Sequence, residues 1–149
     1  MNQVENRPNG SGNGPVGAKM KIDARLIRPI HTVVSEMKRE VAFGGEVSRS
    51  AIRGDNFIMV FNWIKPHEDN APFHDHPFDQ TAYIAQGKIK FTVGDEEFIL
   101  GPGETLQIPA GVPHKGWVMG DETVLNIDIF SPIREDYLHL VEHQLDSFK

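Results

Sequence analysis

Most of the sequence after residue 55 consists of short apolar or alternating segments that are separated by turn residues. Gly, Pro and Asp recur between these segments, in stretches such as GDE, GPGE and MGDE, and these residues are typical of tight turns. The segments that we predict to be strands are 56–64, 80–85, 88–93, 97–100, 105–109 and 123–130. Many short strands at close spacing predict an all-β sandwich or barrel and argue against a fold in which strands and helices alternate.

The two ends of the chain depart from this pattern. Residues 1–20 are rich in Gly, Asn and Pro and offer almost nothing apolar to bury, so we expect a disordered segment there and one domain over 21–149. Residues 134–148 change to helical spacing, which predicts a short amphipathic C-terminal helix. Its apolar positions are Tyr137, Leu138, Val141 and Leu145. A chain of 149 residues without an internal repeat fits a single domain with a substantial core.

The overall composition excludes several classes of function. The formal net charge is −6 and no basic stripe is present, which argues against a nucleic-acid partner. No apolar run approaches the roughly 20 residues that a membrane span needs, and the N-terminus has no signal-peptide core, so we expect a cytoplasmic protein without a membrane partner. The chain has no cysteine. Any metal ion must therefore be held by His, carboxylate or amide ligands.

The most informative stretches are FHDHPFDQTAYIAQG and GPGETLQIPAGVPHKGWV. The first contains His74 and His76, which alternation along a strand would place on the same face. Gln80 follows in the same stretch, and His114 lies in the second. Converging imidazoles suit one divalent ion of Zn, Ni, Fe, Mn or Co, and such a site would keep open positions for water or substrate.

Together, the two stretches resemble the two sequence motifs of the cupin superfamily, each of which forms a β-hairpin of a small jelly-roll barrel. The resemblance covers roughly residues 56–130. It implies an all-β cupin double-stranded β-helix, or jelly-roll barrel, followed by the short C-terminal helix. It also implies the ligands of the metal ion, which are His74, His76, Gln80 and His114. Since cupins commonly pair through their edge strands, a homodimer is expected as well.

The sequence departs from the cupin motifs at three positions. Glu68 stands where the first motif often begins with Gly, and Val118 stands where the second often ends with Asn. Neither position is a ligand, so the barrel prediction is unaffected. The third departure is Gln80, which replaces the usual Glu. An amide leaves the site one negative charge poorer, so we expect a stronger Lewis acid, a small anionic substrate, and a proton-transferring group elsewhere near the metal.

A candidate for that group lies in the segment VLNIDIF, which alternates cleanly between two faces. One face is aliphatic, and we expect it to be packed; it consists of Leu125, Ile127 and Ile129. The other face consists of Asn126, Asp128 and Phe130. An amide, an acid and an aromatic residue in a hydrophobic strand suit a barrel interior with a metal site, where Asp128 could take or deliver a proton. An exposed acid on a strand fits the alternation equally well.

The stretch DIFSPIREDY resembles the end of the barrel in KdgF-type cupins, the uronate-linearising proteins of pectin and alginate breakdown. Members of that group carry an Asp-x-Phe pair at the active site, and an Arg four residues after the Phe. The matching positions are Asp128, Phe130 and Arg134. Ile133 stands where a second Pro is expected. An arginine at the start of a helix, paired with a neighbouring acid, is the alternative interpretation of Arg134.

This second resemblance implies a metal-dependent isomerase or tautomerase that opens and ketonises a small sugar acid, such as an unsaturated uronate. The metal would act as the Lewis acid, Asp128 as the acid and base, and Arg134 as the cation that binds the substrate carboxylate. Three other functions stay open: a metal-dependent dioxygenase, a lyase acting on a small carboxylate, and a non-catalytic cupin that binds a small molecule. A strict need for oxygen would separate the dioxygenase from the isomerase.

Overall fold

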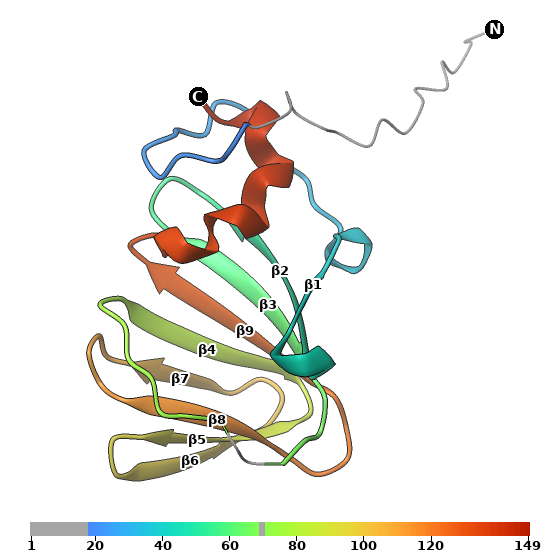
Figure 1. The fold of residues 1–149 in the computed structure, drawn as a ribbon, viewed down its shortest axis with the longest axis vertical. Helices are drawn as coiled ribbons and strands as arrows, with labels where there is room; N and C mark the ends of the chain where they lie inside the picture. Colours follow the sequence, from blue (N-terminus) through green and yellow to red (C-terminus); the bar gives the residue numbers. More distant parts are fainter. Residues whose placement is uncertain (1–17, 69–70) are drawn as a thin grey trace, which may run out of the picture.

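The computed structural model describes residues 18–68 and 71–149, and this part of the chain is built mainly from β-strands (Figure 1). They form a six-stranded sheet in the order β1-β2-β3-β9-β4-β7 and a three-stranded sheet in the order β6-β5-β8. The strands are β1 (Glu40–Ala42), β2 (Val47–Arg53), β3 (Ile58–Ile64), β4 (Asp79–Gln86), β5 (Lys88–Val93), β6 (Glu96–Leu100), β7 (Thr105–Ile108), β8 (His114–Met119) and β9 (Val124–Ser131). Every pairing between them is antiparallel, so the prediction of an all-β fold is confirmed.

The centre of the large sheet brings distant parts of the sequence together. β9 is the last strand of the chain, and it lies between β3 and β4. Asp128 is therefore opposite Val60 on one side and Ala82 on the other. In the same ladder Gln80 is opposite Phe130, which makes Gln80 a diagonal neighbour of Asp128. The register thus places a predicted metal ligand beside the predicted acid.

The buried apolar side chains form two separate clusters. The first joins β2, β3 and β9 to both ends of the described chain; its members are Met20, Ala24, Ala51, Ile58, Val60, Phe130, Ile133, Val141 and Phe148. The second joins the two sheets; its members are Ala82, Ile84, Ile89, Phe91, Leu100, Ile108, Val118 and Val124. Of the buried polar side chains that belong to neither cluster, four come from the strands and loop around the predicted metal site: His76, Gln80, His114 and Asn126. Burying polar groups is costly unless they find partners, so these four mark the place where a function is built into the fold.

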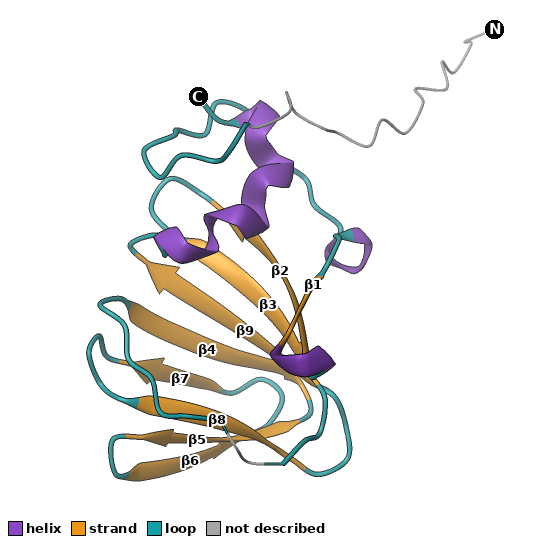
Figure 2. Cartoon of the chain, viewed as in Figure 1, coloured by secondary structure: helices purple, strands orange, loops and turns teal. Residues whose placement is uncertain are grey.

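The C-terminal segment forms helix η3 (Glu135–Ser147), which is of the 3₁₀ type and lies across one end of the large sheet (Figure 2). The apolar positions predicted for this helix, from Tyr137 to Leu145, all pack on the first cluster, and Val141 is fully buried. The prediction of a short C-terminal helix is therefore confirmed. Two further 3₁₀ turns are η1 (Val34–Glu36) and η2 (Phe43–Gly45). Within the described residues no helix has the length and apolar character that a membrane crossing requires.

The predicted N-terminal segment, residues 1–20, lies mostly outside the described residues. Met20, at the end of that segment, is buried in the first cluster. Just after it, the buried guanidinium of Arg53 donates hydrogen bonds of 2.7 to 3.2 Å to the backbone carbonyls of Lys21, Ile22 and Ala24. The start of the domain is thereby fixed to the end of β2.

Candidate metal centre

The three histidines are brought together by backbone pairing between two loops. His74 and His76 lie in the connection between β3 and β4, and His114 is the first residue of β8. The His74 N–H donates to the His114 carbonyl at 3.0 Å, and the His114 N–H donates to the His74 carbonyl at 2.9 Å. The Gly111 N–H donates to the His76 carbonyl at 2.9 Å. The expectation that strand alternation aligns His74 and His76 is wrong, because apart from this one bridge the segment is not in a strand.

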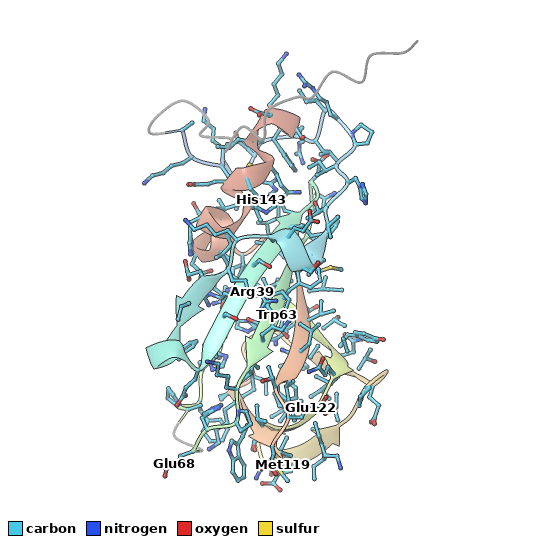
Figure 3. All side chains as sticks on the ribbon, turned by 90° about the vertical axis from the view of Figure 1, so that its right-hand side faces the viewer. Arg39, Trp63, Glu68, Met119, Glu122 and His143 are labelled. Carbon is cyan, nitrogen blue, oxygen red and sulfur yellow. The ribbon has the colours of Figure 1, made fainter. Side chains whose placement is uncertain are left out.

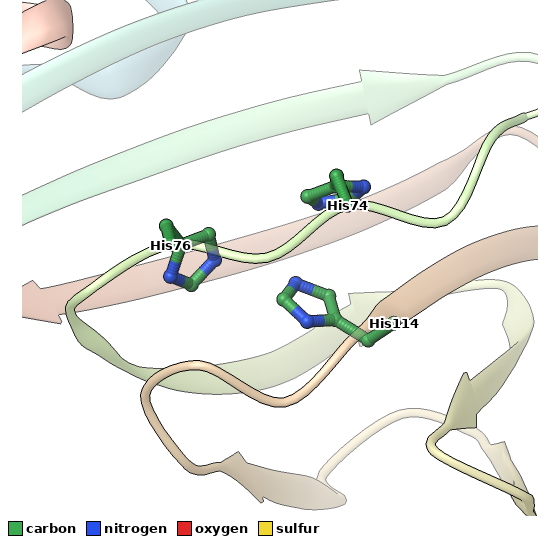
Figure 4. A group of neighbouring side chains, drawn as sticks. All are labelled: His74, His76 and His114. Atoms are coloured by element: carbon green, nitrogen blue, oxygen red, sulfur yellow. The ribbon is translucent and has the colours of Figure 1, made fainter.

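The imidazole rings converge although they come from two segments (Figure 4). One ring nitrogen can be chosen from each of His74, His76 and His114 so that all three atoms lie within 4.8 Å of one another. His76 and His114 are 6% and 1% exposed, whereas His74 is on the exposed side of the group. Two ligand atoms that each lie about 2.1 Å from one ion are at most about 4.2 Å apart, so a small inward movement of the rings would bring all three nitrogens onto a single divalent ion.

Hydrogen bonds orient the buried rings so that their Nε2 atoms face the centre. His76 Nδ1 lies 3.0 Å from the Phe78 carbonyl, and His114 Nδ1 lies 2.8 Å from the Val112 carbonyl. A carbonyl only accepts, so each Nδ1 carries the proton and each Nε2 presents a lone pair. Burial lowers the pKa of both His74 and His114, which favours the neutral form that binds metal.

The lone pair on His114 Nε2 is buried and has no hydrogen-bond partner in the described part of the chain. An orphaned buried acceptor is costly, and a bound cation would remove the cost. The same holds for a second contact, in which His76 Nε2 faces the side-chain oxygen of Gln80 at 3.1 Å. With the His76 proton on Nδ1, this contact joins two acceptors, which is the arrangement of two ligands around one metal ion. The residues present therefore fit a divalent metal held by three imidazoles and the Gln80 oxygen.

Asp128 lies directly behind this ligand group and is surrounded by amides. Its Oδ1 accepts from Gln80 Nε2 at 2.7 Å and from Asn126 Nδ2 at 3.0 Å, and its Oδ2 accepts from Asn62 Nδ2 at 3.1 Å. Burial raises the pKa of Asp128 to about 6, although the hydrogen bonds from Asn126 and Gln80 act in the opposite direction. The sequence left open whether Asp128 faces the barrel interior or is an exposed strand residue, and the structure places it at the interior cavity.

A cavity of about 460 Å³ opens beside these groups. His74, Gln80, His114 and Asp128 all contribute to its wall. Several further wall residues were not singled out as site residues from the sequence: Phe43, Arg49, Asn62, Asn126 and Tyr137. Arg49 was missed because the alternation of β2, VSRSAIR, is masked by its serines and arginines, so the strand itself was not predicted. Its guanidinium is held by Glu40, through Nε at 3.1 Å and Nη2 at 2.7 Å.

Three predicted site residues lie near the centre but outside the cavity wall as the described residues define it: His76, Phe130 and Arg134. Phe130 is 2% exposed, and its ring packs edge-on against His76 with the centroids 5.3 Å apart. Arg134 stacks over the Tyr137 ring at 3.9 Å. Its Nε and Nη2 donate to the two carboxylate oxygens of Asp136 at 3.0 and 2.8 Å. The structure therefore pairs Arg134 with a neighbouring acid.

Comparison with known proteins agrees with this geometry. The cupin domain family matches residues 63–130. KdgF from Halomonas sp. is 25% identical, with a TM-score of 0.66 over 74% of this chain and 100% of that chain. An RmlC-like cupin from Shewanella frigidimarina is 23% identical, with a TM-score of 0.63 over 77% of this chain and 98% of that chain. The polyketide cyclase RemF from Streptomyces resistomycificus is 23% identical, with a TM-score of 0.59 over 70% of this chain and 80% of that chain.

No curated protein sequence matches the chain. The family match covers both histidine-bearing stretches, and the neighbouring structures share the barrel. Over residues 63–130 the chain matches the cupin domain family, and its fold is similar to that of KdgF.

Proposed function

We propose that this protein is a metal-dependent isomerase or tautomerase of a small sugar acid, such as an unsaturated uronate. The observation that carries the proposal is the position of Asp128. Its carboxylate is in the wall of the cavity and is hydrogen-bonded to Gln80, which faces the metal-binding nitrogen of His76. An acid at this place can exchange protons with a substrate that lies against the ligand group. The likeness to KdgF supports the same reaction class.

The chemistry is a rearrangement that needs no oxidant. In the ketonisation step an enol O–H bond breaks and its electron pair forms the C=O bond, while the C=C pair takes a proton to form a new C–H bond. Asp128 accepts the first proton and delivers the second, and a pKa of about 6 suits both directions near neutral pH. A bound divalent metal would supply Lewis-acid stabilisation of the substrate oxygen. Oδ2 is the atom for this exchange, because it accepts one amide bond whereas Oδ1 accepts two.

The substrate carboxylate requires a cation, and two arginines are close enough to be candidates. Arg134 is the candidate from the sequence, but it is not among the residues of the cavity wall. Both guanidinium groups already pair with an acid, Arg134 with Asp136 and Arg49 with Glu40, so the pairing does not separate them. Arg49 is in the cavity wall, and it stacks at 4.8 Å over the Tyr137 ring, which is also in the wall. We therefore assign the direct carboxylate contact to Arg49 and a supporting role to Arg134, which packs on Phe130 and Tyr137. Guanidinium groups suit carboxylates because they offer parallel donors.

The proposal is tested by turnover of an unsaturated uronate under nitrogen, with metal-loaded and chelator-stripped protein. We expect the conjugated double bond of the substrate to disappear faster than it does spontaneously, and only with the metal-loaded protein. A rate that appears only when oxygen is admitted would replace the isomerase with a dioxygenase. The absence of any acceleration by folded, metal-loaded protein would remove the uronate assignment and leave a lyase or a binding protein.

A further inference from the structure

The side-chain amide of Gln80 lies between the imidazole of His76, at the metal-binding position, and the carboxylate of Asp128, which needs a hydrogen-bond donor. Its Oε1 is 3.1 Å from His76 Nε2, and its Nε2 is 2.7 Å from Asp128 Oδ1. An ionised carboxylate can only accept hydrogen bonds, so it determines which end of a neighbouring amide turns toward it. With Nε2 held by Asp128, the oxygen end of Gln80 is presented to the metal ligands.

The environment of Asp128 shows an unbalanced charge. Its hydrogen-bond donors in the described part of the chain are three neutral amides, from Gln80, Asn62 and Asn126. Arg134 is the first cation that affects its pKa, yet that guanidinium is hydrogen-bonded to Asp136. A buried anion without a paired cation is costly. The ligand group has the converse problem, because three imidazoles and an amide leave a dication without any negative charge.

We propose that Asp128 is the positioning residue and outer counter-charge of the metal centre, and that this role is why position 80 is an amide. Its Oδ1 fixes the Gln80 oxygen toward the metal, and its charge balances the dication from just beyond the ligands. A glutamate at position 80 would bring two carboxylate oxygens to the 2.7 Å that now separates Gln80 Nε2 from Asp128 Oδ1. The hydrogen bond to Gln80 uses Oδ1 and the proposed proton transfer uses Oδ2, whereas the counter-charge belongs to the whole carboxylate and is present while Asp128 is ionised.

The test moves the charge from position 128 to position 80. Four proteins are compared: the natural sequence, Q80E, D128N and Q80E/D128N. Affinity for Zn²⁺ is measured by competition with a chelator, and the visible spectrum of the Co²⁺-loaded protein reports the ligand set. Neither readout needs a substrate, so the result is independent of the uronate assay.

With Gln80 present, we expect D128N to weaken Zn²⁺ binding by about 10- to 100-fold, which is the usual effect of losing an outer partner of a metal ligand. It should also change the Co²⁺ spectrum, because nothing then forces the amide oxygen toward the metal. In the Q80E background the same substitution should cause no loss, because the charge now sits on a ligand and the new amide can donate to it. The control is D95N, which makes the same charge change on an exposed turn and should leave the affinity unchanged.

An equal loss from D128N in both backgrounds, or no loss with Gln80 present, would overturn the proposal. Thermal unfolding of the metal-free variants shows whether each is folded. A measurement on the natural sequence guards against misfolding of the variants: with ¹⁵N-labelled glutamine, the Gln80 side-chain NH₂ signal is identified by its absence in Q80E. We expect zinc to shift this signal and hydrogen exchange with solvent to be slow. An unshifted signal with fast exchange would also overturn the proposal.

Discussion

The two faces of β9 differ in chemistry more than in burial. The inner face carries the buried Asn126 and Phe130 and the partly buried Asp128, and its two polar side chains line a cavity whose wall also includes metal-ligand candidates. The outer face is aliphatic, but its side chains are only partly buried: Leu125, Ile127 and Ile129. The expectation that this aliphatic face is packed within the chain is therefore only partly met. The polar side chains therefore lie toward the cavity, whereas the aliphatic side chains on the other side of the strand keep part of their surface exposed.

The apolar outer face continues onto β3, the neighbouring strand. Met59, Phe61 and Trp63 lie opposite Ile129, Ile127 and Leu125 in the ladder. Arg39 covers the Trp63 ring at 3.5 Å, and both are labelled on the side of the molecule seen in Figure 3. Phe61 is 7% exposed and the other members of this face are partly exposed, so the face offers some apolar area to a partner. The homodimer expected from the cupin resemblance was a pairing through edge strands, and it stays a proposal. We propose as its interface this face of the central strands β3 and β9 instead.

The largest effect is expected from removing one ligand at the inner site. His114→Ala removes a nitrogen that is 1% exposed and unpartnered, so we expect metal binding and metal-dependent turnover to fall to background. Equilibrium dialysis with Zn²⁺ measures metal binding, and the uronate assay measures turnover. His31→Ala, on the exposed N-terminal segment, is the matched control and should change neither. Full metal occupancy of the H114A protein would contradict the site.

The next effect concerns the acid on the inner face. Asp128→Asn removes the proton exchange, and we expect kcat to fall by about 10²- to 10⁴-fold in protein saturated with metal. Saturation separates this loss from the weaker metal binding expected for the same variant. A kcat within twofold of the natural protein at full occupancy would remove Asp128 from the chemistry.

The outer face is tested by placing a charge in its centre. Ile127→Lys would bring two like charges together across a symmetric interface, at a cost of several kcal/mol, so we expect a dimer to become a monomer. Light scattering over a range of concentrations measures the mass. Ile99→Lys, at a position 56% exposed on β6 of the other sheet, is the matched control and should leave the mass unchanged. A monomeric natural protein, or the same mass for both variants, would argue against this interface.

The pH dependence of stability reports the buried carboxylate directly. Folding raises the pKa of Asp128 from 3.8 to about 6, mainly by burial. Its contribution to stability is therefore fully present below pH 3.8 and is lost as the pH rises through about 6, which corresponds to about 3 kcal/mol. In metal-free protein, the natural chain should lose about this much stability relative to D128N between pH 4 and 7. Urea unfolding at each pH measures the difference, and a constant difference would contradict the raised pKa.

The smallest effect concerns the cation of the cavity wall. Arg49→Ala should raise KM for the uronate by about tenfold, the lower end of the loss of a hydrogen bond to a charged group, and should leave kcat within a few-fold. Arg134→Ala is compared in the same assay, and we expect a smaller change in KM because Arg134 is not among the residues of the cavity wall. A larger KM effect at Arg134 would reverse the two assignments.

Most of the strands around the site could be predicted from the sequence, because apolar residues recur in them in short segments bounded by turn residues. The predicted segment 88–93 coincides with β5, and 80–85 and 123–130 differ from β4 and β9 by one residue at each end. β8 was not predicted as a strand, because HKGWVM has no clean alternation. Gly116 interrupts it for a tertiary reason: a Cβ there would lie 3.1 Å from the Phe91 ring. Such close packing between strands leaves no trace in local periodicity.

The ligand set could be predicted from motif spacing, but its surroundings could not. The amides around Asp128 come from β3, β4 and β9, and only the strand order brings Asn62 and Asn126 to the same carboxylate. The sequence likewise gave no reason to connect Arg49 with the cavity, since β2 is joined to the site only through β3. Contacts between strands that are distant in the sequence can be predicted only when the strand order is known, whereas contacts within one hairpin can be predicted from the residue spacing.

The reciprocal backbone bridge between His74 and His114 has a mechanical consequence. These residues lie at the two ends of a long loop that includes β4 to β7, and the bridge closes this loop without any metal. A bound ion would then cross-link a loop that is already closed. The entropic cost of closing the loop therefore does not reduce the affinity of the folded protein for the metal. In the unfolded chain the same ion would have to close the loop itself. The metal should therefore slow unfolding while leaving the folded barrel nearly unchanged. The metal-free protein should keep the same fold but unfold faster.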